Sequence, residues 1–211
     1  MSTEGLSKIG LEQLSAFSGI YEFCVNSGNC SITEAKILCL GEVHNESAKL
    51  MVGKFVNLYA NGGDIVLVER VARGEAPPVE EIRDYQFTDR VKIFGWDDMV
   101  LVNKIWRFRA DRNEILKKIS KLHYQDDKDQ ISQLRKESSS LNQQEEDIII
   151  KQRNPSLIHS FQDAREQFPD KRIFLSAGRR HFSKYEDPHI IDELRKDKYI
   201  SLITSGPMNH M

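Results

Sequence analysis

Two short motifs place a histidine three residues after a glycine, each directly behind an apolar run. Gly-Glu-Val-His follows the run AKILCL, and Gly-Arg-Arg-His follows RIFLSA. A third apolar run, DIVLVE, ends in a glutamate. Carboxylates and imidazoles are the side chains that most often bind metals or move protons. We take the four as candidate catalytic residues: Glu42, His44, Glu69 and His181.

Two kinds of chemistry fit this set. As metal ligands, two imidazoles and two carboxylates suit Zn, Mn, Co or Fe better than calcium, and one carboxylate can remain as the base for a bound water. Without a metal, His44 is the base that activates water, Glu42 or Glu69 orients its ring, and an arginine stabilises the oxyanion. The sequence leaves both alternatives open.

The same residues also have purely structural interpretations. Glu42 and His44 could cap a following helix, because acidic groups are favoured near a helix N-terminus. Glu69 and Arg70 could form a local ion pair. Arg179, with its neighbour Arg180, either binds an anionic group on a substrate or is solvated. The support for a functional interpretation is that the two histidine motifs occur in equivalent positions behind strands.

Three buried strands must position these residues, and we predict them over 36–40, 64–69 and 171–177. A helix over 47–60 lies between the first two, which gives the strand, helix and strand of a parallel crossover. In an open parallel sheet, ligands bind outside the carboxyl ends of the strands. The candidate residues would therefore share one crevice.

The remaining segments complete an alternation of helices and strands. Asp97 and Asp98 are read as caps of a helix that begins near Met99, with a place at the rim of the crevice open to Asp97. We predict a helix over about 11–24, a short strand over 90–96, two long polar helices in an insertion over 100–152, a helix from Asn154-Pro155 to about 167, a helix over about 188–196 and a last strand over 199–204. The predicted fold is a single three-layer α/β domain over 1–211, with a mostly parallel sheet flanked by helices. The polar insertion is expected to act as a lid or to offer a surface to a protein partner.

Composition limits the partners. A chain of 211 residues with 39% apolar residues can bury one sizeable core. Its 30 basic and 32 acidic residues are scattered, with no basic stripe, so no nucleic-acid partner is expected. We see no bilayer-spanning run and no cleavable signal peptide, and predict a cytoplasmic protein without a membrane partner, leaving export by a specialised route open. The three cysteines indicate no disulfide framework.

This pattern resembles the superfamily that joins the Tiki and TraB proteins, the erythromycin esterases, the ChaN-like haem-binding proteins and a domain of some bacterial toxins. Its members have, in order, a strand ending in Gly-Glu-x-His, a strand ending in an acidic residue, an Arg-Asn pair opening a late helix, and a strand ending in Gly-x-x-His. This chain supplies Gly41 to His44, Glu69, Arg153-Asn154 and Gly178 to His181. The resemblance covers most of the chain from about residue 36 onward.

The resemblance implies that Glu42, His44, Glu69 and His181 form the polar centre, supported by Arg153 or Asn154. With the arginines above, the predicted substrate-binding residues are Arg70, Arg153, Asn154 and Arg179. The expected function is hydrolysis of a peptide, ester or amide bond in a small-molecule or peptide substrate, with or without a divalent metal. Two alternatives stay open: a haem or small-molecule binding protein with His44 or His181 as axial ligand, and a non-enzymatic interaction module of a bacterial effector or toxin.

Overall fold

One sheet organises the chain, in a computed structural model that describes residues 22–182 and 190–205. The strand order is β1-β6-β2-β5-β3-β4; β1 is antiparallel to β6 and the other neighbours are parallel. The strands are β1 (Glu22–Gly28), β2 (Ile37–Glu42), β3 (Ile65–Ala72), β4 (Lys92–Asp97), β5 (Ile173–Gly178) and β6 (Tyr199–Ser205). The prediction of a mostly parallel α/β sheet is confirmed.

The central strands open with long apolar runs, and both of their faces are covered. All six residues of β2 are buried. Leu38 and Leu40 contribute to the core on one face of the sheet, and Ile37 and Cys39 contribute to the core on the other. A strand buried on both faces has no polar side, which is why its sequence reads as a continuous apolar run.

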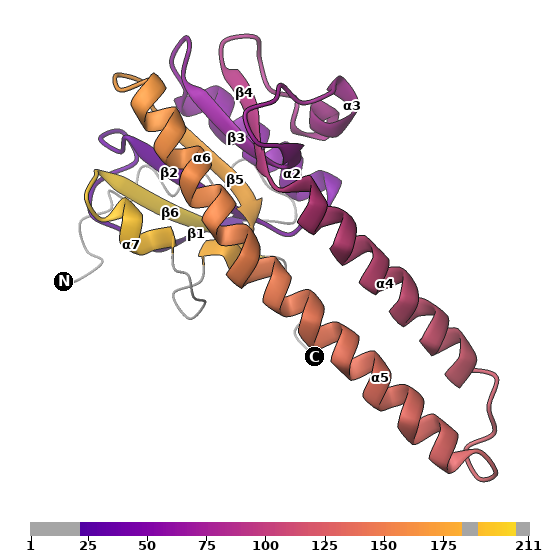
Figure 1. Ribbon diagram of the computed structural model, residues 1–211. Helices are drawn as coiled ribbons and strands as arrows, with labels where there is room; N and C mark the ends of the chain where they lie inside the picture. Colours follow the sequence, from indigo (N-terminus) through magenta and orange to yellow (C-terminus); the bar gives the residue numbers. More distant parts are fainter. Residues whose placement is uncertain (1–21, 183–189, 206–211) are drawn as a thin grey trace.

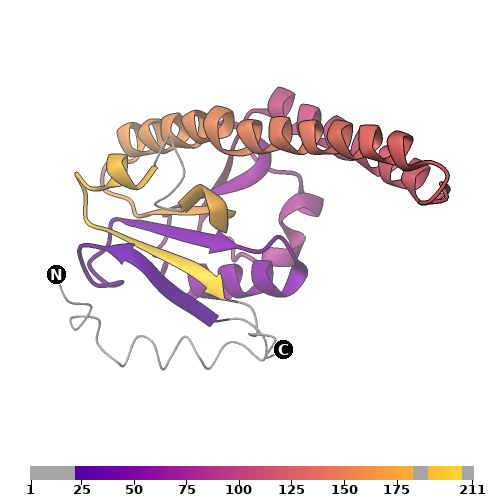
Figure 2. The same ribbon diagram turned by 90° about the horizontal axis from the view of Figure 1, so that it is seen from below.

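Helices cover the two faces of the sheet and complete the three layers (Figure 2). On one face lies α2 (Glu46–Tyr59), whose apolar side packs into the first core. On the other lie α6 (Arg153–Gln167) and α7 (Ile190–Leu194), which pack into the second core. The short helices are α3 (Val79–Ile82), η2 (Arg83–Tyr85), which packs against α2, and η4 (Arg179–Phe182), which follows β5 directly.

A helical hairpin projects beyond the sheet (Figure 1). It consists of α4 (Met99–Ile119) and α5 (Lys128–Asp147). The two predicted polar helices are therefore present. The second helix does not end at Asp147, because α5 continues through the π-helical segment η3 (Ile148–Gln152) into α6.

The predicted helix from Asn154-Pro155 to about 167 is present as α6, but it follows η3 directly, without a break in the helical chain. Proline lacks an N–H, and inside an α-helix its ring clashes with the carbonyl four residues earlier. For Pro155 that carbonyl belongs to Lys151, which lies in η3. The wider π-helical hydrogen-bonding pattern before the proline is consistent with the chain continuing as a helix instead of starting a new one.

Two smaller predictions need correction. The end of the predicted helix over 11–24 is strand β1, which starts at Glu22, whereas 11–21 lie outside the described residues. Only Asp98 of the two adjacent aspartates caps α4, by accepting the N–H groups of Val100 and Leu101. Asp97 ends β4 and is buried. Its contacts belong to the site described next.

Candidate functional site

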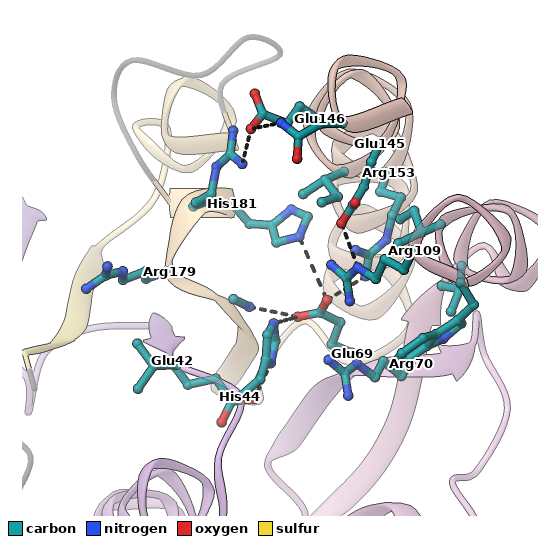
Figure 3. A pocket seen from close by; sticks show the side chains of 18 of the residues that line it. Glu42, His44, Glu69, Arg70, Arg109, Glu145, Glu146, Arg153, Arg179 and His181 are labelled. Atoms are coloured by element: carbon teal, nitrogen blue, oxygen red, sulfur yellow. Dashed lines mark hydrogen bonds and ion pairs between the residues drawn. The ribbon is translucent and has the colours of Figure 1, made fainter. Parts of the chain in front are cut away.

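A pocket of about 340 Å³ lies at the carboxyl ends of β2, β3 and β5 (Figure 3). Glu42, His44, Glu69 and His181 all line it. The parallel register explains the meeting of the two glycine motifs, because Glu42 pairs with Gly178 across β2 and β5. The four residues predicted to share a crevice are brought together; their catalytic roles stay a prediction.

Glu69 lies at the centre of the pocket, and its side chain is 5% exposed. One carboxylate oxygen accepts from Arg153 Nη2 at 2.6 Å, and the other accepts the Gly178 N–H at 2.7 Å. Burial alone would raise the pKa of Glu69, but Arg153 and the two nearby imidazoles outweigh burial and hold that pKa well below its usual range. Glu69 is thus a fixed negative charge.

Asp97 and Arg153 form a buried brace behind Glu69. Arg153 donates from Nε to Asp97 Oδ1 at 2.9 Å and from Nη2 to Asp97 Oδ2 at 2.5 Å. Burial raises the pKa of Asp97, against the opposing effect of Arg153. Burial also disfavours the guanidinium, but Asp97 and Glu69 more than offset it and raise the pKa of Arg153. Asp97 was read from the sequence mainly as a cap, and only its position at a strand end hinted at this role.

His181 is held as a neutral ring. It is 2% exposed, and its Nδ1 lies 2.5 Å from Asn154 Oδ1. Burial lowers its pKa to about 4, with Glu69 opposing and Arg153 reinforcing the shift. The amide oxygen of Asn154 can only accept, so Nδ1 carries the hydrogen. Nε2 then carries the lone pair, 4.0 Å from Glu69 Oε1.

Glu42 is the more isolated carboxylate. It is 1% exposed, and its Oε1 accepts from the Tyr85 hydroxyl at 2.7 Å. Within the described residues, its Oε2 has no hydrogen-bond partner. Burial, and then Glu42 itself, raise the pKa of Tyr85 well above its usual value, so the hydroxyl remains a donor. Tyr85 was not foreseen, because it lies in η2, 43 residues along the chain from Glu42.

His44 lies between the two carboxylates. Its Nδ1 is 3.5 Å from Glu42 Oε1 and its Nε2 is 3.3 Å from Glu69 Oε2, with the side chain 33% exposed. A Cβ on Gly178 would come within 2.7 Å of that Nε2, so the glycine makes room for the ring. The cap of α2 is Asn45, which accepts the Ala48 N–H. The capping alternative for Glu42 and His44 is therefore excluded.

The four residues predicted to bind substrate fall into three groups. Asn154 is fully buried against His181 and does not line the pocket, and the Arg153 guanidinium is occupied by two carboxylates, so both position other residues. Arg179 is exposed at the edge of the pocket, and Figure 3 shows it directed away from His44. Arg70 faces the space beside Glu69 and His44 (Figure 3). Its expected ion pair with Glu69 is replaced by that of Arg153.

The geometry does not favour the predicted metal site. Within residues 22–182 and 190–205, no group of three or more His, Cys, Asp or Glu side chains is arranged to hold a metal ion. Both oxygens of Glu69 already accept hydrogen bonds, one of them from a guanidinium whose charge opposes a nearby cation. Metal binding stays a prediction that metal analysis must test.

Comparisons of the chain with protein-family models, with curated proteins and with solved structures gave no match. The superfamily resemblance therefore rests on the motifs and their order. In the part of the chain that the structure describes, no helix has both the length and the apolar character needed to span a membrane.

Proposed function

We propose that this protein hydrolyses an ester, amide or peptide bond with a water molecule activated by an imidazole. The observation that carries the proposal is the position of the Glu69 carboxylate between two rings, 3.3 Å from His44 Nε2 and 4.0 Å from His181 Nε2. An ionised carboxylate between two imidazoles, in one pocket, is an arrangement suited to proton transfer.

The contacts favour His181 over His44 as the general base. A ring that is neutral at pH 7, with a hydrogen on Nδ1 and a lone pair on Nε2, can accept a proton from water. A water molecule between Nε2 and Glu69 Oε1 could donate one hydrogen to each. When His181 takes its proton, the water oxygen adds to the carbonyl carbon, and Glu69 stabilises the imidazolium that forms.

His44 is suited to the opposite task. Its ring is the more exposed of the two, with 33% of the side chain exposed. An N–H of this ring can donate to the oxyanion of the tetrahedral intermediate or to the departing group. The leaving alcohol or amine then departs with the proton that His181 took from water, which restores the neutral ring, and the acyl group leaves as a carboxylic acid. Arg153 and Asp97 hold Glu69 in place throughout.

The test is hydrolysis by the purified full-length protein of 4-nitrophenyl acetate, leucine 4-nitroanilide and a mixed peptide library. His181→Ala, His44→Ala and Glu69→Gln should each lower kcat by about 10²- to 10⁴-fold. His159→Ala is the matched control, because His159 is an exposed residue of α6 that does not line the pocket. Assays with EDTA, and with Zn, Mn, Co or Fe added back, separate metal-dependent from metal-free hydrolysis.

Other outcomes would point to the alternatives. Absent hydrolysis together with a Soret band on adding haem, lost in His44→Ala or His181→Ala, would identify a haem-binding protein. If the wild type shows neither hydrolysis nor haem binding nor bound metal, an interaction module that uses the helical hairpin replaces the enzyme.

A further inference from the structure

Three arginines form one wall of the pocket, on the side of the helical hairpin. Arg70 comes from β3, and Arg109 and Arg112 come from α4. Glu145 faces this wall and pairs with Arg109 at 2.6 Å and with Arg112 at 3.0 Å. We call these three arginines the arginine wall. Glu145 is shared by two of the three guanidinium groups, which leaves the wall with an excess of positive charge.

Arg70 is the member of the wall whose charge is not neutralised. Within the described residues, its side chain makes no ion pair, and its guanidinium lies 5.6 Å from the centre of the Trp106 ring. Arg109 lies 5.4 Å from the same ring. Contact with an aromatic ring holds a guanidinium in position but leaves its N–H donors available to a ligand.

The backbone at Arg70 is strained in a way that serves this placement. Its φ is +67°, in the left-handed region that non-glycine residues rarely adopt. Its N–H donates to Asp97 Oδ2 at 2.9 Å, and the pairing of β3 with β4 is irregular between Val68 and Ala72. In a regular strand, neighbouring side chains point to opposite faces. Here Glu69 and Arg70 line the same pocket.

These observations point to one kind of ligand. We propose that the substrate carries an oxyanion, a carboxylate or a phosphate, and that Arg70 binds it with the support of the arginine wall. The planar guanidinium fork matches the geometry of such oxygens. That the bound anion is part of a substrate rests on the proposed function, but anion binding itself can be measured without turnover.

The binding test uses benzoate, its neutral analogue benzamide, and inorganic phosphate, each measured by thermal shift and by calorimetry on the full chain. Benzoate or phosphate should raise the melting temperature of the wild type, and benzamide should not. Arg70→Gln should weaken anion binding by about tenfold or more, the loss of a charged hydrogen-bond donor. Arg70→Lys should restore part of it, since it keeps the charge without the fork.

Arg107→Gln is the control, because Arg107 is an exposed arginine of α4 that does not line the pocket. It should bind anions as the wild type does. Comparing benzoate with phosphate shows which oxyanion the wall prefers. Equal binding of benzoate and benzamide, or wild-type anion binding by Arg70→Gln, would overturn the proposal.

A kinetic arm connects the wall to turnover. The substrates are 4-acetoxybenzoate and its methyl ester, which differ only in one carboxylate. The wild type should have the lower KM for the charged ester, and Arg70→Gln should lose that preference. Hydrolysis without charge preference would refute the proposal and leave the proposed function standing. If the wild type binds anions and Arg70→Gln does not, but the wild type hydrolyses no substrate, then the anion site stands and the proposed function is refuted.

Discussion

The two sides of the pocket are built differently. On the sheet side, Glu69, Asp97, Arg153 and His181 are buried and joined by hydrogen bonds or close contacts. On the hairpin side, Arg70 of β3 and Arg109 of α4 contact Trp106, which is 49% exposed and lies on a helix that projects past the sheet. If the proposed function holds, the buried side fixes the distances that proton transfer needs, and Arg70 of β3 with Arg109 and Arg112 of α4 supplies positive charge on the other side. Proton transfer and anion binding would then be carried by differently built sides of one pocket.

The largest effect is expected from breaking the buried brace on the sheet side. Asp97→Asn leaves Arg153 with one carboxylate instead of two, and should lower the free energy of unfolding by about 3 to 5 kcal/mol. Urea denaturation followed by circular dichroism measures it. Asp98→Asn is the control, because asparagine caps helices about as well as aspartate. Equal stability of the two variants would show that the brace does not hold the sheet side together.

The next largest effect is expected from the buried imidazole of His181, which makes the free energy of unfolding depend on pH. The unfolded chain binds a proton at His181 near its ordinary pKa of 6.5, whereas the folded protein does so only near 4. Between these values the unfolded state binds more protons, so stability falls as pH falls, by about 1.4 kcal/mol per pH unit for one proton.

Denaturation of the wild type and His181→Gln at several pH values isolates this contribution. The wild type should lose more stability than the variant between pH 6.5 and 4. Activity should likewise persist until the base is protonated, near pH 4. Parallel stability curves for the two proteins would mean that His181 is not a buried neutral ring.

A smaller change tests the space between the two motifs. Gly178→Ala puts a methyl group within 2.7 Å of His44 Nε2, and overpacking of this kind costs about 1 to 3 kcal/mol. Because His44 is partly exposed, its ring can rotate away, so activity should fall more than stability. Gly62→Ala is the control, since a Cβ there meets no atom within 4 Å. Unchanged kcat in Gly178→Ala would argue against a role for the present position of His44.

The smallest free energy of local unfolding is expected for the helical hairpin of α4 and α5. Its helices bury few residues; only Ile131 and Glu145 are buried in α5. Hydrogen exchange should therefore be faster over 117–146 than in β5, where every residue is buried. Exchange as slow in the hairpin as in β5 would mean that both sides of the pocket are equally rigid.

Sequence alone predicts the sheet side better than the hairpin side. The ends of β2, β3 and β5 are visible because apolar runs stop at a glycine or a charge. The roles of Asp97 and Tyr85 could not be predicted, because each depends on a contact with a distant residue. Asp97 contacts Arg153, 56 positions away, and Tyr85 contacts Glu42, 43 positions away. β1 was missed because an edge strand of mixed polarity lacks a continuous apolar run. Of the arginine wall, only Arg70 was predicted, since no local sequence pattern shows that Arg109 and Arg112 of α4 line the pocket.

The π-helical segment sets the rotational phase of the long helix. Glu145 precedes it and Arg153 follows it, yet both line the pocket. A π-helical turn holds one residue more than an α-helical turn, which acts as a one-residue insertion. If 148–152 were wound as a regular α-helix with the same number of residues, everything beyond would be turned by about 100° relative to the hairpin. Arg153 would then leave Glu69, so the register of this helix, as much as the identity of its residues, determines whether the site exists.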